Sequence, residues 1–342
     1  MHLKRVMILF SLFVGYSVSA QIGGESTYQF LNMSNSARIA ALGGNQVAVN
    51  DSTDLNLAFY NPALLKNAAV NQLVINYVNY LTDINFGYVS YAFSLGKIGT
   101  MATGMHYVNY GNFVEADENG IKTGNNFTAG EYALNIIWSK RINRWHVGAT
   151  IKPILSSFES YQSFGIAGDL GVSVLSRNKR SSVGMVARNI GTQITTYYEG
   201  GKKESVPFEI LAGYSQKLAH APVIFSVTAQ HLNHWDLANP DAGDTQDEFE
   251  TELTESFGKQ FMRHILIGVE LLPSDHFILR VGYNYQLRQQ LKLDERLSTV
   301  GFSLGFGVKI KRFSLDYSTT RYHVAGSSNL ISLAFNFSRN YF

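Results

Sequence analysis

Apolar and polar residues alternate through the stretch from 277 to 287, which reads FILRVGYNYQL. One set of alternate positions is apolar and comprises Phe277, Leu279, Val281, Tyr283, Tyr285 and Leu287. The positions between them include Arg280, Asn284 and Gln286. Successive side chains of a β-strand point to opposite faces, so this stretch predicts a strand with one apolar and one polar wall. Its length of about ten residues suits a tilted strand that crosses a bilayer, whereas strands of soluble proteins usually end after about five or six.

The same alternation returns along most of the chain. Fourteen segments show it, near 71–80, 83–95, 97–110, 129–140, 144–156, 161–175, 181–191, 206–217, 221–234, 261–272, 277–287, 299–310, 312–320 and 328–342. After the first twenty residues, no stretch approaches 18 uninterrupted apolar residues, as a membrane helix would need. The pattern therefore predicts an all-β membrane protein, a 14-stranded antiparallel transmembrane β-barrel.

The connections between the predicted strands fall into two alternating sets. One set is short and often basic, and lies near 94–97, 140–144, 176–181, 217–220, 273–275 and 309–312. The other contains the long connections, at 111–127, 191–205, 235–260, 288–298 and 319–328, together with two short members near Leu81 and Ser157. Outer-membrane barrels sort their connections in this way, with short periplasmic turns and longer extracellular loops. We therefore expect an integral outer-membrane protein with extracellular long loops and both termini on the periplasmic side.

The N-terminal part of the chain does not alternate and predicts two further regions. A basic pair and an apolar run end at Val18-Ser19-Ala20, as in a secretory signal peptide spanning residues 1–20. An uncleaved membrane helix is the alternative, for which the run is short. A barrel of this size encloses more space than its inward side chains fill. We therefore expect residues 21–70 to form a plug of short helices and turns inside a barrel formed by residues 71–342.

The composition agrees with a membrane barrel and excludes several other classes. Charged residues make up 16% of the 342 residues, whereas soluble domains average roughly 25%. The net charge of +2 gives no reason to expect nucleic acid as a partner, and the absence of cysteine excludes disulfides and thiolate metal sites. No Gly-x-Ser-x-Gly motif stands between a predicted strand and a predicted helix, as a nucleophile elbow requires. We therefore expect no catalytic residue, no enzyme activity and no cofactor.

Three motifs within the predicted plug resemble one family of outer-membrane barrels. They are Ser36-Ala37-Arg38, Ala41-Leu42-Gly43-Gly44 and Asn61-Pro62-Ala63. Their arrangement, after a signal peptide and before the amphipathic strands, is similar to the N-terminal hatch of the PorV/PorQ family. That family is itself similar to the FadL-like fatty-acid transport barrels. The resemblance covers essentially the whole mature chain, and it marks Asn61, Pro62, Ala63, Gly43 and Gly44 as the plug motif.

The resemblance also implies a function and partners. It implies a non-enzymatic outer-membrane component of the type IX secretion system, which is found in Bacteroidota. Such a component belongs to a cell-surface attachment complex with PorV, PorU and PorZ, and it holds the surface protein PorZ. The complex links secreted cargo to anionic lipopolysaccharide through PorU. The alternative is a FadL-like outer-membrane transporter of hydrophobic small molecules.

The predicted outer loop from 235 to 260 is the candidate docking site for a partner. Its candidate residues are Trp235, Asp241, Asp244, Asp247, Glu248 and Glu250, and no lysine or arginine occurs between 241 and 255. Calcium-assisted docking of a partner or of lipopolysaccharide is one interpretation, although the acidic spacing does not match an EF-hand loop. Partner contact without a metal and a solvated loop without a partner are the others. We expect no metal site.

Eight charged residues fall on the inward faces of the predicted strands. They are Glu131, Lys152, Asp169, Arg188, Glu209, Glu270, Arg280 and Asp316. They could line a polar conduction path. Because an unpaired charge beside a packed lumen is costly, we instead expect them to bond to one another and to the plug.

His231 and His234 lie three residues apart, with Asp236 nearby. On a helix this spacing could bind zinc. At the end of a strand, residues three apart face opposite sides, so we expect an interfacial role for these histidines and for Trp235.

Overall fold

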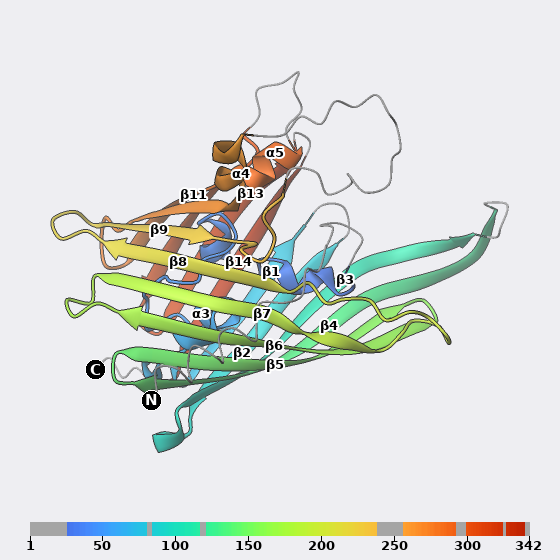
Figure 1. Cartoon of the computed structure of the whole chain (residues 1–342), viewed down its shortest axis with the longest axis horizontal. Coiled ribbons are helices and arrows are strands. Elements are labelled where there is room, and N and C mark those ends of the chain that lie inside the picture. Colours follow the sequence, from blue (N-terminus) through green and yellow to red (C-terminus); the bar gives the residue numbers. More distant parts are fainter. Residues whose placement is uncertain are drawn as a thin grey trace, which may run out of the picture.

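The computed structural model describes residues 26–80, 84–116, 121–237, 256–291, 299–323 and 326–338. Within these residues, 14 antiparallel strands form a closed barrel (Figure 1). Each strand pairs with its neighbours in the sequence, and β1 closes the ring against β14 in a register that runs from Gln72↔Asn336 to Asn79↔Asn329. The predicted fold class and strand number are confirmed.

The strands and helices have the following bounds in the described residues. The strands are β1 (Gln72–Asn79), β2 (Asn85–Ser94), β3 (Thr100–Ala116), β4 (Lys122–Ile142), β5 (Trp145–Phe158), β6 (Tyr161–Leu175), β7 (Ser181–Thr195), β8 (Glu209–Lys217), β9 (Val223–Ala229), β10 (Ile265–Leu271), β11 (Phe277–Asn284), β12 (Phe302–Ile310), β13 (Phe313–His323) and β14 (Gly326–Asn336). The helices are η1 (Gln29–Asn32), α2 (Ala37–Ala40), α3 (Leu57–Tyr60), η2 (Pro62–Leu64), η3 (Asn67–Ala69), η4 (Gly96–Ile98), α4 (Phe257–His264) and α5 (Tyr285–Leu291). Among them, none has the length and hydrophobicity needed to cross a membrane.

The two faces of the strands follow the predicted alternation. On β11, Phe277, Leu279 and Val281 point outward and are 37%, 40% and 45% exposed, whereas the inward Arg280 is 2% exposed. Exposed apolar side chains recur on the outer face of other strands, for example Leu304 of β12 at 54%. The outer wall is therefore apolar and suited to lipid, while the inner wall is polar.

Strand β11 ends earlier than the alternation predicts. It stops at Asn284 and helix α5 begins at Tyr285, so the predicted continuation of the strand through Tyr285 to Leu287 is wrong. The Asn284 side chain accepts a hydrogen bond from the Leu287 amide at 3.0 Å, as an N-cap residue does. The neighbouring strand β12 begins only opposite Tyr283, so β12 provides no strand partner for β11 beyond that residue.

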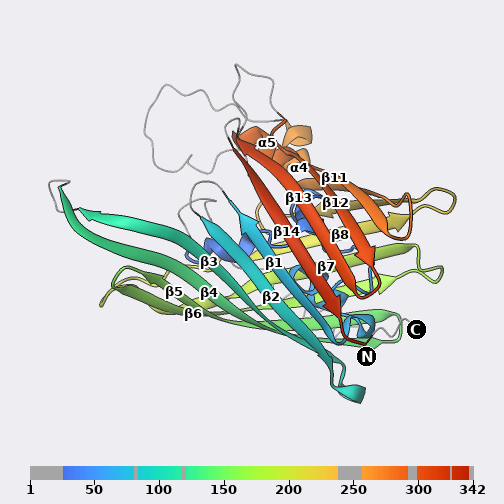
Figure 2. The same ribbon diagram turned by 180° about the vertical axis from the view of Figure 1, so that it is seen from behind.

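Strands β3 to β7 project beyond the rest of the barrel at the end that carries the long connections (Figures 1 and 2). Strand β3 continues to Ala116 and β4 begins at Lys122, so most of the predicted loop 111–127 is strand. The rings of Phe113 and Phe127 stack across this hairpin with centroids 5.2 Å apart. The alternation of apolar and polar residues does not predict this extension, because both faces of the extended hairpin are exposed and neither face needs to be apolar.

Helix α4 also departs from the prediction. It occupies the end of the predicted loop 235–260 and the start of the predicted strand 261–272. The observed strand therefore begins only at Ile265. The Ser256 carbonyl accepts hydrogen bonds from the amides of Lys259 and Gln260 at 2.9 and 3.2 Å, which closes the first turn of this helix. The preceding strand β9 ends at Ala229, short of the predicted 234, because the chain turns through a left-handed conformation at His231, with φ 53°.

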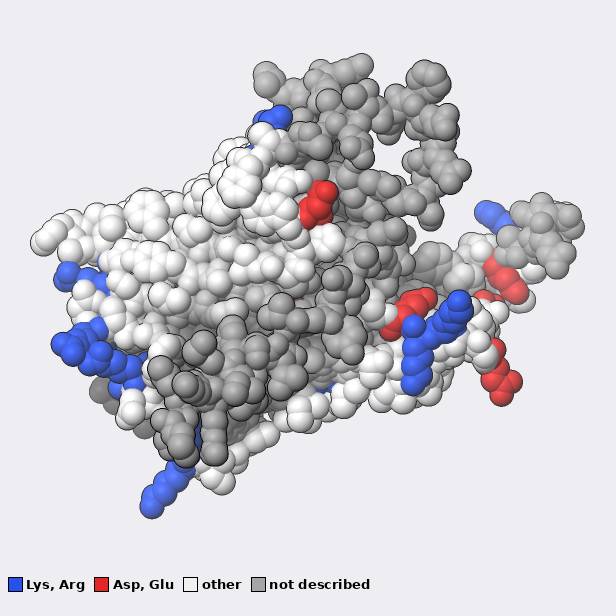
Figure 3. All heavy atoms as spheres, viewed as in Figure 1, with Lys and Arg blue, Asp and Glu red and all other residues white. Residues whose placement is uncertain are grey.

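The connections after β2, β4, β6, β8, β10 and β12 are short and gather at one end of the barrel, which we call the short-turn end. The opposite end is the long-loop end. Basic residues at the short-turn end include Lys97, Lys140, Arg141, Arg144, Arg177, Lys179, Arg180, Lys217, Lys309, Lys311 and Arg312. On the face shown in Figure 3, lysine and arginine but no acidic side chains are visible at this end, whereas both kinds are visible at the other end. The predicted gathering of short turns at one end is confirmed, although the long-loop end also carries a short connection between β5 and β6.

Residues 26–70 lie inside the barrel as a series of short helices and turns (Figure 1). Their side chains Ile39, Leu42 and Leu57 are 0% exposed and pack in one cluster with wall residues such as Val74 and Ile137. We call residues 26–70 the plug. The predicted signal peptide, residues 1–20, lies outside the described residues.

The depth at which a charge is placed on the outer wall should decide its effect on stability. Leu304→Arg, in the middle of β12, should lower the free energy of unfolding by about 2–4 kcal/mol, and Ile310→Arg, at the rim of the same strand, by about 0–1 kcal/mol. The check is denaturant unfolding of the protein refolded into lipid vesicles. Equal effects of the two substitutions would contradict a lipid-facing wall.

Candidate functional site

The turn at Asn61 holds the plug together from within. The Asn61 side chain accepts a hydrogen bond from the Ala63 amide at 3.0 Å and donates one to the Val47 carbonyl at 2.9 Å. Pro62 opens helix η2, a position at which its fixed φ and missing amide hydrogen are tolerated. One side chain therefore caps this helix and joins it to an earlier segment of the plug. Asn61 and Ala63 are both 0% exposed.

Glycines of the wall let this turn lie directly against the strands. A Cβ atom at Gly171 of β6 would lie 2.1 Å from Asn61 Oδ1. A Cβ atom at Gly148 of β5 would lie 2.4 Å from the carbonyl carbon of Pro62. No larger residue fits at either wall position without a shift of the plug.

The other predicted plug residues, Gly43 and Gly44, follow helix α2. Their φ angles are +101° and +109°, in the region that favours glycine. The Gly43 and Gly44 amides donate to the carbonyls of Ala40 and Ile39 at 3.1 and 3.0 Å, which satisfies the end of the helix. The glycine pair thus ends the helical turn of α2.

Arg38 of helix α2 joins the plug to the barrel wall. Its Nε and Nη2 atoms donate to the two carboxylate oxygens of Glu270 on β10, at 3.0 and 2.9 Å. Its Nη1 atom donates to Asp51 Oδ2 at 2.8 Å and to Asp54 Oδ2 at 3.0 Å within the plug. Arg38 is 4% exposed. A bidentate pair of this kind fixes the orientation of the guanidinium as well as its position.

The network continues along the inner wall from Glu270. Arg280 on β11 donates from Nε to Glu270 Oε1 at 2.9 Å and from Nη1 to Asp316 Oδ1 on β13 at 2.6 Å. Lys309 on β12 donates to Asp51 Oδ2 at 3.1 Å. Four consecutive strands therefore each contribute one charged side chain. Every charge in the network has an opposite partner, as burial requires.

Two further ion pairs lie on the inner wall of β5 to β8. Lys152 Nζ is 2.8 Å from Asp169 Oδ1, and Arg188 pairs with Glu209. Arg188 Nη1 also donates to Asn45 Oδ1 of the plug at 3.3 Å.

The prediction that the inward charges pair with one another is confirmed for seven of the eight, and two of these, Glu270 and Arg188, also bond to the plug. The exception is Glu131, whose carboxylate accepts hydrogen bonds from the hydroxyls of Tyr110 and Ser156 at 2.5 and 3.1 Å. Hydroxyl donors thus take the place of a cation at this buried position.

Burial and pairing act differently on the two plug aspartates. Burial alone would raise the pKa of Asp51, but Arg38 and Lys309 hold it well below its ordinary value. Burial raises the pKa of Asp54, and Arg38 only partly opposes this. Asp51 is therefore the more firmly ionised partner of Arg38.

A serine motif in β12 needs separate description. Gly301-Phe302-Ser303-Leu304-Gly305 matches the spacing Gly-x-Ser-x-Gly. Ser303 lies within the strand, is 2% exposed and accepts a hydrogen bond from the Thr320 hydroxyl at 3.1 Å. A nucleophile elbow places its serine at an exposed turn from a strand into a helix. The position of Ser303 therefore does not fit that role.

Trp235, the first of the candidate docking residues, belongs to an aromatic group at the long-loop end. Its ring stacks on Phe257 and His264, with centroids 5.3 and 5.1 Å away. Trp235 is 49% exposed and Phe257 is 73% exposed, so the group presents an apolar surface. The acidic candidates Asp241, Asp244, Asp247, Glu248 and Glu250 lie outside the described residues.

Of the two candidate histidines, His231 lies near Glu209, and the pair does not form part of a metal-binding group among the described residues. His231 Nδ1 is 3.4 Å from Glu209 Oε1, and the His234 amide donates to the His231 carbonyl at 3.0 Å. Among the described residues, no group of three or more histidine or acidic side chains is placed to hold a metal ion.

Sequence reasoning missed two features of the site. The pairing of Arg38 with Asp51 and Asp54 was not expected, although only four charged residues occur between 26 and 70 and these are three of them. Helix α4 was also missed. The spacing of Phe257 and Phe261, four residues apart and directly after Ser256, is the signal that could have found it.

Comparison with known proteins shows the fold of this chain but does not show its family. No protein-family model matches the chain, and no curated protein matches its sequence. Among solved structures, the "TodX monoaromatic hydrocarbon channel deltaS2 mutant" superposes with a TM-score of 0.51 at 12% identity, over 91% of this chain and 100% of that one. This likeness shows that the chain shares the fold of integral outer-membrane barrels.

Other outer-membrane structures match less well. CdiB from Acinetobacter baumannii has a TM-score of 0.37 at 12% identity, over 77% of this chain and 59% of that one. LpxR from Salmonella typhimurium has a TM-score of 0.32 at 12% identity, over 78% of this chain and 100% of that one.

Arg38→Gln should release the plug from the wall. It removes the cation that joins Glu270 to Asp51 and Asp54, and breaking a buried pair in this way costs about 3–5 kcal/mol of unfolding free energy. Denaturant unfolding should show this loss, and planar bilayers should show a higher ion conductance. The matched control is Lys309→Gln, whose side chain is 35% exposed and whose loss should cost less than about 1 kcal/mol. Equal effects of the two variants would contradict the role given to Arg38.

The two plug aspartates should respond to acid in opposite directions. Asp51 has a depressed pKa in the folded state, so its contribution to stability is present above the unfolded value of about 4 and is lost as the pH falls through the lower folded value. Asp54 has a raised pKa, so its protonation in acid favours the folded state. The midpoint of thermal unfolding should therefore fall less between neutral and acidic pH in Asp51→Asn than in the unsubstituted protein. In Asp54→Asn it should fall more. If the dependence of the thermal midpoint on pH changed in the same direction in both variants, the opposite roles given to Asp51 and Asp54 would be excluded.

Proposed function

We propose that this protein is a non-enzymatic outer-membrane platform that holds a surface partner at its long-loop end. The observation that carries the proposal is the plug, which is fixed to the wall by the buried ion pairs of Arg38 and Glu270. Packing adds to this, because plug side chains such as Leu42 and Leu57 are fully buried against the wall. A bore that is filled and fastened in this way suits a scaffold better than an open pore.

The long-loop end offers a surface on which a partner could dock. Strands β3 to β7 project there beyond the other strands (Figure 1). The projecting parts and the connection after β7 carry Phe113, Val114, Ile194 and Tyr198, which are 41%, 51%, 51% and 65% exposed. Apolar side chains beyond the lipid-facing band have no lipid to contact, and exposed apolar clusters of this kind mark protein interaction sites.

The partners in this proposal come from the resemblance of the plug motifs to the PorV/PorQ family. The long loops then face the cell exterior and the short turns face the periplasm. The docked partner is a PorZ-like surface protein, with PorU and PorV in the same attachment complex and lipopolysaccharide as the acceptor of its cargo. The protein is accordingly a PorQ-like component of the type IX secretion system.

Recovery of the protein from native membranes in mild detergent tests the platform. A large surface protein should co-purify in fixed proportion with the tagged chain. Val114→Asp, on the projecting hairpin, should reduce this recovery about tenfold, since an unpaired charge in a docking surface costs more than about 1.4 kcal/mol. Ile98→Asp is the matched control at the short-turn end, where Ile98 is 62% exposed, and it should leave recovery unchanged. Absence of any stoichiometric partner would contradict the proposal.

Transport of hydrophobic small molecules is the second candidate function. Its specific observation is a shallow, open aromatic hollow of about 330 Å³ at the long-loop end, lined by Phe158, Tyr161, Tyr197 and Tyr198. The overall likeness to a barrel whose name describes a monoaromatic hydrocarbon channel also favours it.

Extraction of bound molecules distinguishes the two functions. A transporter should carry a hydrophobic ligand through purification, and Phe158→Ala with Tyr198→Ala should reduce ligand uptake by cells. A platform should show no ligand and no change in uptake, while its surface partner remains bound.

A further inference from the structure

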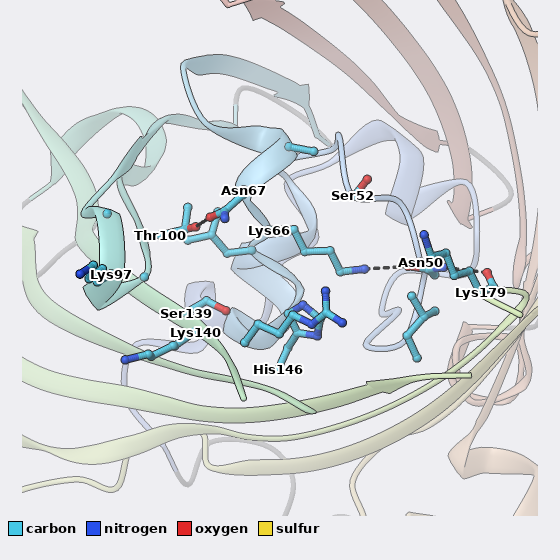
Figure 4. Close-up of a pocket in the computed structure, with 16 residues that line it drawn as sticks. Asn50, Ser52, Lys66, Asn67, Lys97, Thr100, Ser139, Lys140, His146 and Lys179 are labelled. Atoms are coloured by element: carbon cyan, nitrogen blue, oxygen red, sulfur yellow. Dashed lines mark hydrogen bonds between the residues drawn. The ribbon is translucent and has the colours of Figure 1, made fainter. Parts of the chain in front are cut away.

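A cavity of about 510 Å³ opens at the short-turn end of the bore, between the plug and the wall (Figure 4). Its lining includes six basic side chains: Lys66, Lys97, Lys140, Arg141, His146 and Lys179. The plug supplies Lys66, and the short connections or the strand ends beside them supply the others. No aspartate or glutamate lines the cavity. We call this cavity the basic pocket.

The cations of the basic pocket are not neutralised within the described part of the chain. None of its lysine or arginine side chains forms an ion pair there. Lys66 Nζ donates instead to the uncharged side chain of Asn50 at 2.6 Å, across the pocket in Figure 4. Asp51 interacts with Lys66 at longer range, but its carboxylate is already bound by Arg38 and Lys309.

His146 adds a further unpaired group beneath Lys66 (Figure 4). Its Nδ1 atom is buried and has no hydrogen-bond partner among the described residues. Lys66 and Arg141 both lie close enough to interact electrostatically with the His146 ring. The lysine and arginine charges that line this partly enclosed pocket repel one another, and an anionic ligand would relieve that repulsion.

We propose that the basic pocket binds an acidic peptide segment of a protein in the compartment that the short turns face. Aspartate, glutamate or a C-terminal carboxylate would pair with Lys66 and Arg141. The volume is in the range of known ligand pockets, about 300–1,000 Å³. The plug forms one side of the pocket, inside the ring of strands, whereas bilayer lipid lies outside that ring. This position favours a soluble chain over a lipid headgroup as the occupant.

The surrounding surface supports the same class of ligand. Lysine and arginine predominate in the short connections at this end of the barrel (Figure 3). A field of one sign attracts an oppositely charged partner over a distance of about one Debye length and raises the rate of its association. The surface charges would then attract the acidic peptide, and the side chains of the basic pocket would make the specific contacts with it.

Fluorescence anisotropy on the full chain in uncharged detergent tests the proposal. The probe is a labelled decapeptide of glutamate, and the matched glutamine decapeptide is the neutral comparison. The glutamate peptide should bind about tenfold or more tightly than the glutamine peptide, and added salt should weaken its binding. Lys66→Gln combined with Arg141→Gln should weaken it about tenfold, whereas Lys66→Arg combined with Arg141→Lys should retain it.

The charge-matched control is Lys217→Gln combined with Lys311→Gln, at the same end of the barrel but outside the pocket lining. It should change the affinity less than about threefold, as removal of exposed charges does. An equal loss in both double variants would overturn the proposal in favour of diffuse surface charge. Loss of co-purified anionic phospholipid from the pocket variant, with peptide binding unchanged, would overturn it in favour of a lipid occupant.

Two further measurements distinguish a loss of peptide binding from a failure to fold and from a failure of the proposed function. The heat-dependent change in gel mobility that a folded barrel shows should be the same in all variants. Recovery of the surface partner at the long-loop end should not depend on Lys66 or Arg141, because the basic pocket is at the opposite end of the bore.

Discussion

The contact between Arg38 and Glu270 is the interaction on which the interior of this barrel depends. The outer wall is apolar for lipid, so the polar side chains of each strand face a bore with little access to bulk water. Charges placed there need partners. Arg38 supplies one from the plug, and through Asp51 and Asp54 it also holds the plug's own chain in place. The plug and the inner wall are therefore each incomplete without the other.

Close backbone contact has the same effect as charge in joining the plug to the wall. Gly171 and Gly148 leave room for Asn61 and Pro62, which in turn fix the path of the plug through Val47 and Ala63. A glycine in a strand interior gives up packing and costs conformational entropy. Here that cost is offset by a surface into which the plug fits. The inner face of the wall is thus complementary to this plug, just as its apolar outer face is complementary to lipid.

The two ends of the barrel differ in chemistry, and this difference organises the proposals about function. The long-loop end has a projecting wall and exposed aromatic residues such as Trp235 and Phe257. The short-turn end has an excess of cations, part of which surrounds the basic pocket at Lys66. A plugged barrel with two distinct ends is suited to joining one partner on each side of a membrane without an open passage between them.

The sequence by itself determined the strands, their number and their faces, because a lipid-facing wall imposes a period of two on every spanning segment. It also determined which charges point inward, such as Glu270 and Arg280. Tertiary structure decided what a periodic pattern does not contain. Arg38 meets Glu270 across 232 positions of sequence, and β11 gives way to a helix at Asn284 because β12 offers no partner there. The basic pocket likewise exists only because the closed ring brings Lys66 of the plug beside Arg141 of the wall.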